Sequence, residues 1–298
     1  MTFDWEKYIE SRPDLKKNWN SPIRALIHKT IVLKIDEFLE KSHVSVKENN
    51  SRGIVVHGLH KSGTMFLVLF FHELLKNQKY IFFSDNWKII KEKPSENLKK
   101  SISTNFCLCV ERKFKNRIED KKFKNMKEIV HLYQVRDPRD ILVSQYYSFG
   151  WTHSSEGAKN IKRFEKTRMK IQSQTIDEYV LATASRVKRK YVPLSNKSGN
   201  YEENELVIKY EDMVLEFHDW TQRIVAFLKL ENPEEIIEGL YSYFKEEFNI
   251  NKIQEGKFLN SHKRKMTPGD YKDKLKPETI EKLNTIFAKE LRLFGYER

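Results

Sequence analysis

Lys61, Ser62 and Thr64 form the first group of side chains in this sequence that could do chemistry. They lie in a polar turn, residues 58–64, between a short β-branched run and an apolar segment long enough for a helix. A helix start of this kind leaves backbone N–H groups unpaired, and the helix dipole adds positive potential there. Because the lysine adds a full charge and the hydroxyls add donors, the turn predicts a site for a phosphate-like anion.

Arg136 and Ser144 form a second group of this kind, spaced eight residues apart. Arg136 follows an apolar, strand-like run, and Ser144 faces back along a helix that begins near Pro138. A guanidinium binds phosphate through two parallel hydrogen bonds, so the pair predicts a second anion site. The alternative is that Asp137 and Pro138 only cap a helix and that Arg136 is a surface residue. That alternative explains the turn but not the cluster of basic residues.

Strand-like runs separated by helical or mixed segments must position these residues. The runs are residues 54–56, 80–83, 106–110, 129–135 and 206–210. This order predicts an α/β fold, a three-layer sandwich with a central, mostly parallel sheet flanked by helices. Ligands of such sheets bind beyond the carboxyl ends of the strands. The residues that follow strand ends, and that we expect to converge there, are Lys61, Asp85, Glu111 and Arg136.

The rest of the chain reads as helices and loops around this sheet. We expect residues 1–50 to be a helical extension packed on one globular domain, residues 51–298. Residues 150–170 predict a loop or lid followed by a helix. Further helices are predicted over residues 140–149, 220–228, 233–248 and 277–292.

Composition narrows the classes of function. The chain has 298 residues, 39% of them hydrophobic, a formal net charge of +13 and a pI near 9.4. These values indicate a globular protein with an anionic ligand or partner. A basic nucleic-acid-binding protein is one alternative, although no DNA- or RNA-binding motif accompanies the charge. A further alternative is a nucleotide kinase or ATPase, which would need Mg²⁺ and a carboxylate to hold it.

The cysteines and the apolar segments indicate in which compartment the protein works and what it binds. Cys107 and Cys109 share one face of a predicted strand, which suits reduced core residues of an intracellular protein. The N-terminus is acidic and polar, unlike a signal peptide, and the longest apolar run, residues 65–71, is too short to span a bilayer. We therefore expect a cytoplasmic protein that binds a small molecule and neither a membrane nor nucleic acid.

The position of Lys61 separates the turn from a nucleoside-triphosphate loop. A Walker A loop places its lysine directly after its second glycine, whereas Lys61 precedes Gly63 by two residues. The order Lys-Ser-Gly-Thr at a strand-to-helix turn resembles the 5′-phosphosulfate loop of sulfotransferases. The chain would then be P-loop-like in fold without being an ordinary ATP-binding protein.

Two more segments carry the same resemblance. Residues 136–147, RDPRDILVSQYY, resemble the 3′-phosphate motif of sulfotransferases that use 3′-phosphoadenosine-5′-phosphosulfate (PAPS). Residues 263–272, KRKMTPGDYK, are similar to the family's Arg-Lys-Gly-x-x-Gly-Asp-Trp-Lys segment, with Met266 and Tyr271 as departures. Residues 210–212 resemble the Tyr-Glu-Asp that follows a strand between these motifs. Three motifs in family order identify the chain as a member of the family.

The resemblance implies an activity and a set of donor-binding residues. It implies in-line, metal-free transfer of a sulfuryl group from PAPS to a hydroxyl or to an amine or guanidine nitrogen of a soluble small molecule. The product of the donor would be 3′-phosphoadenosine 5′-phosphate (PAP), and Lys61 would stabilise the leaving oxygen. The implied donor-binding residues are His60, Lys61, Ser62, Gly63, Thr64, Met65, Arg136, Ser144, Tyr210, Arg264, Lys265 and Gly269.

A general base for the acceptor is also expected. The family often places a histidine at the end of the strand before the arginine motif, whereas the corresponding strand here ends at Glu111. Glu111 is therefore the first candidate, Asp85 the second and His153 the third. The alternative for Glu111 is a surface carboxylate paired with Arg112.

Overall fold

The computed structural model describes residues 52–78, 80–83, 105–111, 128–152, 161–248 and 268–296. Within them, five parallel strands form one sheet in the order β2-β3-β1-β4-β5. The strands are β1 (Arg52–Gly58), β2 (Ile81–Phe83), β3 (Phe106–Glu111), β4 (Glu128–Val135) and β5 (Glu205–Lys209). Since all five run in one direction, the residues that follow β1 and β4 meet at the same edge of the sheet.

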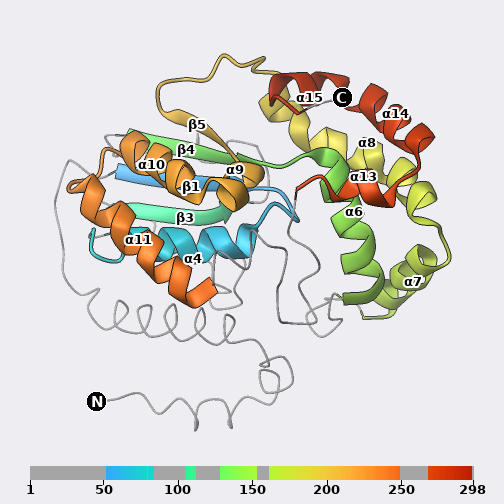
Figure 1. The fold of residues 1–298 in the computed structure, drawn as a ribbon, viewed down its shortest axis with the longest axis horizontal. Coiled ribbons are helices and arrows are strands. Elements are labelled where there is room, and N and C mark those ends of the chain that lie inside the picture. The colour runs from blue at the N-terminus through green and yellow to red at the C-terminus, as the bar shows by residue number, and fades with distance from the viewer. Residues whose placement is uncertain are drawn as a thin grey trace, which may run out of the picture.

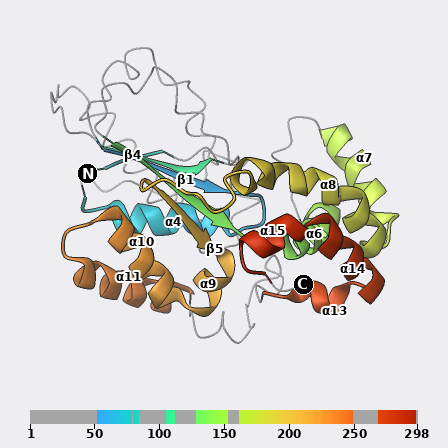
Figure 2. The same cartoon turned by 90° about the horizontal axis from the view of Figure 1, so that it is seen from above.

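Three helices pack on one face of this sheet, as Figures 1 and 2 show. They are α4 (Thr64–Leu75), α10 (Phe217–Leu228) and α11 (Pro233–Phe248). Residues 67–75 of α4 are all buried, because its nearly continuous apolar sequence faces the sheet on one side and α11 on the other. The rings of Phe70 and Trp220 meet at 4.6 Å within this core. This packing fixes the start of α4 at the carboxyl edge of the sheet.

A second group of helices lies beyond that edge (Figure 1). It contains α6 (Pro138–Tyr147), the π-helical turn η3 (Ser148–Thr152), α7 (Ile161–Gln172), α8 (Ile176–Ser195), α13 (Asp270–Lys274), α14 (Pro277–Ile286) and α15 (Ala288–Leu293). Its core includes the fully buried rings of Tyr191 and Phe287. One more short helix, α9 (Tyr210–Leu215), follows β5 directly.

The predicted α/β class, with a parallel sheet flanked by helices, is confirmed. The interpretation of Cys107 and Cys109 as buried, reduced core residues is confirmed as well. No helix in the described ranges is long and apolar enough to cross a membrane. The predicted helical extension, residues 1–50, lies outside the described residues, so the domain boundary stays a prediction.

Three local expectations were wrong or incomplete. The helix predicted over residues 277–292 is two helices, because Phe287 leaves the helical conformation at φ −100° and ψ 15°. Tyr210, expected at the end of a strand, is the first residue of α9. The 20-residue helix α8 was not predicted, although Thr175 and Glu178 form a capping box at its start.

Candidate active site

The turn after β1 has the backbone of an anion cradle. Lys61 and Gly63 both adopt left-handed conformations, with φ of 73° and 74°. The Ser62 side chain is buried and donates to the Leu59 carbonyl at 2.7 Å, which closes the turn on itself. Helix α4 begins at Thr64 without a side-chain cap. Its first N–H groups therefore have no capping oxygen, as a helix end that binds an anion requires.

Gly63 fits this turn for two independent reasons. Its φ of +74° is a conformation that side-chain-bearing residues rarely adopt. A Cβ on Gly63 would also lie 3.0 Å from Met213 Cε and 3.1 Å from Tyr210 Cδ2. Helix α9 therefore packs directly against the turn and leaves no room for a larger residue.

The end of β4 holds the same turn from the other side. Arg136 Nη1 donates to the Lys61 carbonyl at 2.6 Å, and Gln134 Nε2 donates to the Ser62 carbonyl at 2.6 Å. The guanidinium of Arg136 lies 4.1 Å from the centre of the Tyr210 ring. Burial lowers the pKa of Arg136, but nearby Tyr210, Asp140, Glu211 and Asp137 outweigh it and raise the pKa overall. A permanent positive charge thus lies beneath the turn.

The side chain of Lys61 reaches the far end of helix α6. Its Nζ donates to Ser148 Oγ at 2.9 Å. Ser148 is the first residue of η3, the π-helical turn that continues α6. The ammonium group is therefore held at the end of α6.

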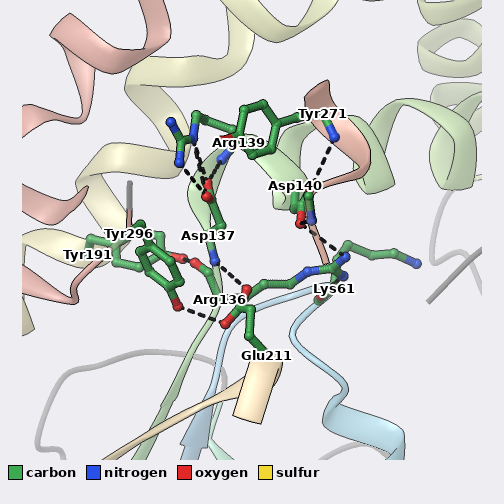
Figure 3. Close-up of polar contacts among 10 residues, drawn as sticks. Lys61, Arg136, Asp137, Arg139, Asp140, Tyr191, Glu211, Tyr271 and Tyr296 are labelled. Atoms are coloured by element: carbon green, nitrogen blue, oxygen red, sulfur yellow. Dashed lines mark hydrogen bonds and ion pairs between the residues drawn. The ribbon is translucent and has the colours of Figure 1, made fainter. Parts of the chain in front are cut away.

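Asp140, at the start of α6, binds the segment that contains Tyr271, as Figure 3 shows. Asp140 accepts hydrogen bonds from the backbone N–H groups of Gly269 at 2.7 Å and Tyr271 at 3.0 Å. Arg136 Nη2 lies 4.0 Å from the same Asp140 carboxylate. Burial raises the pKa of Asp140, and the charge of Arg136 partly offsets that rise. The third motif is thereby brought next to the second.

A largely buried carboxyl, Glu211, supports the turn between β4 and α6 from below. It accepts from the Asp137 backbone N–H at 3.0 Å and from the Tyr296 hydroxyl at 3.0 Å. Burial raises the pKa of Glu211 to about 7. The hydroxyl of Tyr191 donates to the Arg136 carbonyl in the same cluster. Figure 3 shows these side chains gathered around residues 136 and 137.

Six of the predicted site residues are linked by the contacts described above. They are Lys61, Ser62, Gly63, Arg136, Tyr210 and Gly269. Tyr210 is only 3% exposed, so it supports Arg136 and Gly63 with its ring. Thr64 and Met65 begin α4, and the Met65 side chain is exposed. His60 and Ser144 are half-buried, His60 in the turn and Ser144 on α6.

Of the three candidate bases, only Glu111 lies within the described residues. Glu111 is the last residue of β3 and pairs, after a register shift, with His57, the residue before the end of β1. Its backbone is therefore at the carboxyl edge of the sheet, two strands away from Arg136. Asp85, His153, Arg264 and Lys265 lie outside the described residues.

Several residues of the site were not predicted from sequence. Ser148 contacts Lys61, and Tyr191 and Tyr296 hold the turn at residues 136–137. The capping box before α8 signals the helix that carries Tyr191. No sequence pattern pairs Tyr296 with Glu211, which is 85 residues earlier.

Comparison with known proteins shows to which family of enzymes the chain belongs. The chain matches the sulfotransferase domain over residues 51–295, which is most of its length. It therefore belongs to the sulfotransferase family and is a transferase that moves sulfuryl groups. None of the curated proteins matches the chain.

The chain is also similar to solved structures. The structure of mouse sulfotransferase SULT7A1 complexed with PAP is 16% identical, with a TM-score of 0.57 over 83% of this chain and 85% of that chain. Retinol dehydratase in a complex with retinol and PAP is also 16% identical, with a TM-score of 0.41 over 83% and 82% of the two chains. The likeness to the mouse enzyme shows that the two proteins share a fold.

Proposed function

We propose that this enzyme takes the sulfuryl group from PAPS and transfers it, in line and without a metal, to a hydroxyl or to an amine or guanidine nitrogen. The acceptor in this proposal is a soluble small molecule, and the compartment is the cytoplasm. The observation that carries the proposal is the hydrogen bond from Arg136 to the Lys61 carbonyl at 2.6 Å. It joins the motif expected to bind the 5′-phosphosulfate to the motif expected to bind the 3′-phosphate.

The residues present fit a donor with two anionic groups. The first group would bind at the positive-φ turn, where α4 has no side-chain cap and Lys61 adds a charge. The second would bind near Arg136, whose Nε is buried and has no hydrogen-bond partner in the part of the chain that the structure describes. A buried donor without a partner is costly unless an acceptor such as a phosphate oxygen completes it. Ser144, Gly269, Arg264 and Lys265 are proposed to complete this second group.

Lys61 has the central chemical role in this proposal. PAPS, when bound, supplies the sulfuryl group and a phosphate oxygen on which negative charge develops during transfer. The Lys61 ammonium, held 2.9 Å from Ser148 Oγ, and the N–H groups at the start of α4 would stabilise that charge. Fixed donors of this kind typically contribute about 10²–10³ in rate each. We propose that these cationic and backbone groups take the place that a metal ion has in many phosphoryl-transfer enzymes.

The acceptor must lose a proton, and we propose Glu111 as the base, with Asp85 and His153 as the other candidates. Glu111 ends β3 at the carboxyl edge, where its backbone pairs with His57 of β1, the strand that leads into the turn. A base within hydrogen-bond reach of the acceptor typically adds about 10²–10⁴ in rate.

The proposal is tested by transfer of radiolabelled sulfuryl from PAPS to a panel of phenols, alcohols and amines. A Lys61→Ala variant should lose roughly 10²–10³ in kcat, because it loses the charge at the leaving oxygen. The matched control is Lys229→Ala, at an exposed lysine after α10. Full activity of Lys61→Ala would overturn the role of the turn, and loss of activity in Lys229→Ala would show that the assay reports general damage.

A further inference from the structure

The peptide unit that joins Arg136 to Asp137 lies beyond the last paired residues of β4. Pairing between β4 and β5 ends at Val135, opposite Lys209. Arg136 and Asp137 are only 6% and 5% exposed. Buried backbone groups need hydrogen-bond partners, and at this point the sheet no longer supplies them. Side chains must therefore satisfy the carbonyl and the N–H of this peptide unit.

Two side chains do so, one at each edge of the peptide unit. The Tyr191 hydroxyl donates to the Arg136 carbonyl, and a Glu211 oxygen accepts from the Asp137 N–H at 3.0 Å. Figure 3 shows both side chains next to residues 136 and 137. A peptide unit is planar, and its carbonyl and N–H point in opposite directions. Hydrogen bonds at both edges therefore fix the orientation of the whole unit.

Tyr296 holds the other oxygen of Glu211, to which its hydroxyl donates at 3.0 Å. The way in which α15 ends places this tyrosine. Gly295 has a φ of 66°, and the N–H groups of Gly295 and Tyr296 donate to the carbonyls of Arg292 at 3.3 Å and Leu291 at 2.8 Å. This pair of hydrogen bonds is a Schellman motif, a common end of a helix. The end of α15 thus reaches a carboxyl 85 residues earlier in the chain.

The two tyrosines belong to one packed group of helices. Tyr191 is on α8, its ring centre lies 6.0 Å from that of Phe294, and α15 packs on α8. Burial raises the pKa of the Tyr191 and Tyr296 hydroxyls well above the ordinary value of 10, so both hydroxyls keep the protons that they donate. The helices beyond the sheet edge therefore hold the peptide unit at the end of β4.

The orientation of this unit matters because the Arg136 side chain leaves the backbone at the Cα where the unit begins. Its Nη1 donates to the Lys61 carbonyl at 2.6 Å, while its buried Nε has no hydrogen-bond partner among the described residues. Contacts between a guanidinium and a phosphate depend on their mutual alignment. A rotated peptide unit would therefore turn the guanidinium away from a phosphate that it would otherwise meet.

We propose that Tyr191, Glu211 and Tyr296 are positioning residues for the donor, because they hold the peptide unit that directs Arg136 toward the 3′-phosphate. We call these three residues the peptide clamp. The inference rests on the proposed use of PAPS and adds residues that act through Arg136. A group that is held in place before binding loses less conformational freedom when the ligand arrives, which increases affinity. The clamp should therefore affect only nucleotides that carry a 3′-phosphate.

Calorimetric titration with two nucleotides tests this proposal. PAP carries the 3′-phosphate and adenosine 5′-monophosphate lacks it, so the ratio of their Kd values measures the contribution of that phosphate. Tyr296→Phe and Tyr191→Phe each remove one hydroxyl and keep the ring. Each should weaken PAP binding by about threefold, the usual net effect of one hydrogen bond, and leave the binding of the monophosphate unchanged. An unchanged ratio in both variants would overturn the proposal.

Two substitutions of Glu211 separate positioning from charge. Glu211→Ala leaves the Asp137 N–H and the Tyr296 hydroxyl without their acceptor, and should weaken PAP binding by about tenfold or more. Glu211→Gln keeps an oxygen for the Asp137 N–H and an amide group that can donate to the Tyr296 oxygen. It should therefore keep the Kd of PAP within about twofold. A glutamine variant as weak as the alanine variant would overturn the clamp.

Tyr133→Phe is the matched control. The Tyr133 hydroxyl donates to Glu205 Oε1 at 3.0 Å, so this variant breaks a buried hydrogen bond of the same kind and length between β4 and β5. It should lower the stability and leave the ratio of the two Kd values unchanged. If the control lost the preference for PAP as much as Tyr296→Phe, the effect would follow general destabilisation, and the role of the clamp would be overturned.

Failure of this inference is distinguishable from failure of the proposed function. A wild-type chain that binds both nucleotides equally would contradict the use of PAPS, whatever the clamp variants do. A wild-type chain that prefers PAP, with clamp variants that keep the full preference, would refute the clamp alone.

Discussion

Glu211→Gln should remove a specific pH dependence from the stability of the chain. The pKa of Glu211 is raised by burial from an ordinary value of 4.5 to about 7. Between these two values the folded state binds more protons than the unfolded state, so the free energy of unfolding falls as pH rises. The glutamate's contribution is fully present below about pH 4.5 and is lost as pH passes about 7.

The size of this effect follows from the shift. A shift from 4.5 to about 7 corresponds to at most about 3 kcal/mol, because one pKa unit is about 1.4 kcal/mol and the side chain keeps some contact with solvent. Glutamine imitates the protonated glutamate and does not titrate. It keeps one oxygen to accept from the Asp137 N–H or the Tyr296 hydroxyl. Arg136 is the cation that limits the rise in the Glu211 pKa.

Urea unfolding at a series of pH values measures this contribution. The free energy of unfolding of the wild type minus that of Glu211→Gln should fall by up to about 3 kcal/mol between about pH 4.5 and about pH 7.5. The difference cancels the other groups that titrate in both proteins. A constant difference across this range would refute the buried, raised-pKa state of Glu211, and so would a rising one.

Three further outcomes follow from the site. Gly63→Ala should lower the free energy of unfolding by about 1–3 kcal/mol, because φ is positive at this position and an added Cβ would lie 3.0 Å from Met213 Cε. The control is Gly239→Ala, where an added Cβ has nothing within 4 Å and should not lower the stability. Unfolding in denaturant measures both. Arg136→Ala should raise the donor KM roughly tenfold or more and the acceptor KM much less, as steady-state kinetics would show; equal effects would contradict its role. Glu111→Gln should lower kcat by about 10²–10⁴, and an unchanged kcat excludes it as the base.

The strands and the turns that follow them could be predicted from the sequence. The β-branched run at residues 54–56 and the apolar run at 129–135 are strands β1 and β4. Because the strands are parallel, Lys61 and Arg136 meet at one edge, as expected. The lysine two residues before Gly63 also distinguished this turn from a Walker A loop.

The supporting contacts of the site could not be predicted, since they depend on packing between distant segments. Arg136 uses one guanidinium nitrogen to hold the Lys61 carbonyl, a contact that no motif encodes. Tyr296 reaches Glu211 only because the C-terminal helices pack against α8. Helix α8 itself was predictable, since Thr175 and Glu178 have the spacing of a capping box.

The break between α14 and α15 falls at a buried core residue, Phe287. Its ring is fully buried in the core formed with α8, and the chain leaves the helical conformation at that residue. The apolar spacing of residues 277–292 continues through the break, so the periodicity predicts a single helix. The division into two helices could therefore not be predicted from the sequence.

Thermal unfolding with nucleotides tests the central claim most directly. PAP should stabilise the chain, by about 2.7 kcal/mol at a concentration 100 times its Kd, because it binds only the folded state. Adenosine 5′-monophosphate, which lacks the 3′-phosphate, should stabilise it far less at the same concentration, with or without Mg²⁺. No stabilisation by PAP would contradict the account, and so would a requirement for Mg²⁺ or equal stabilisation by both nucleotides.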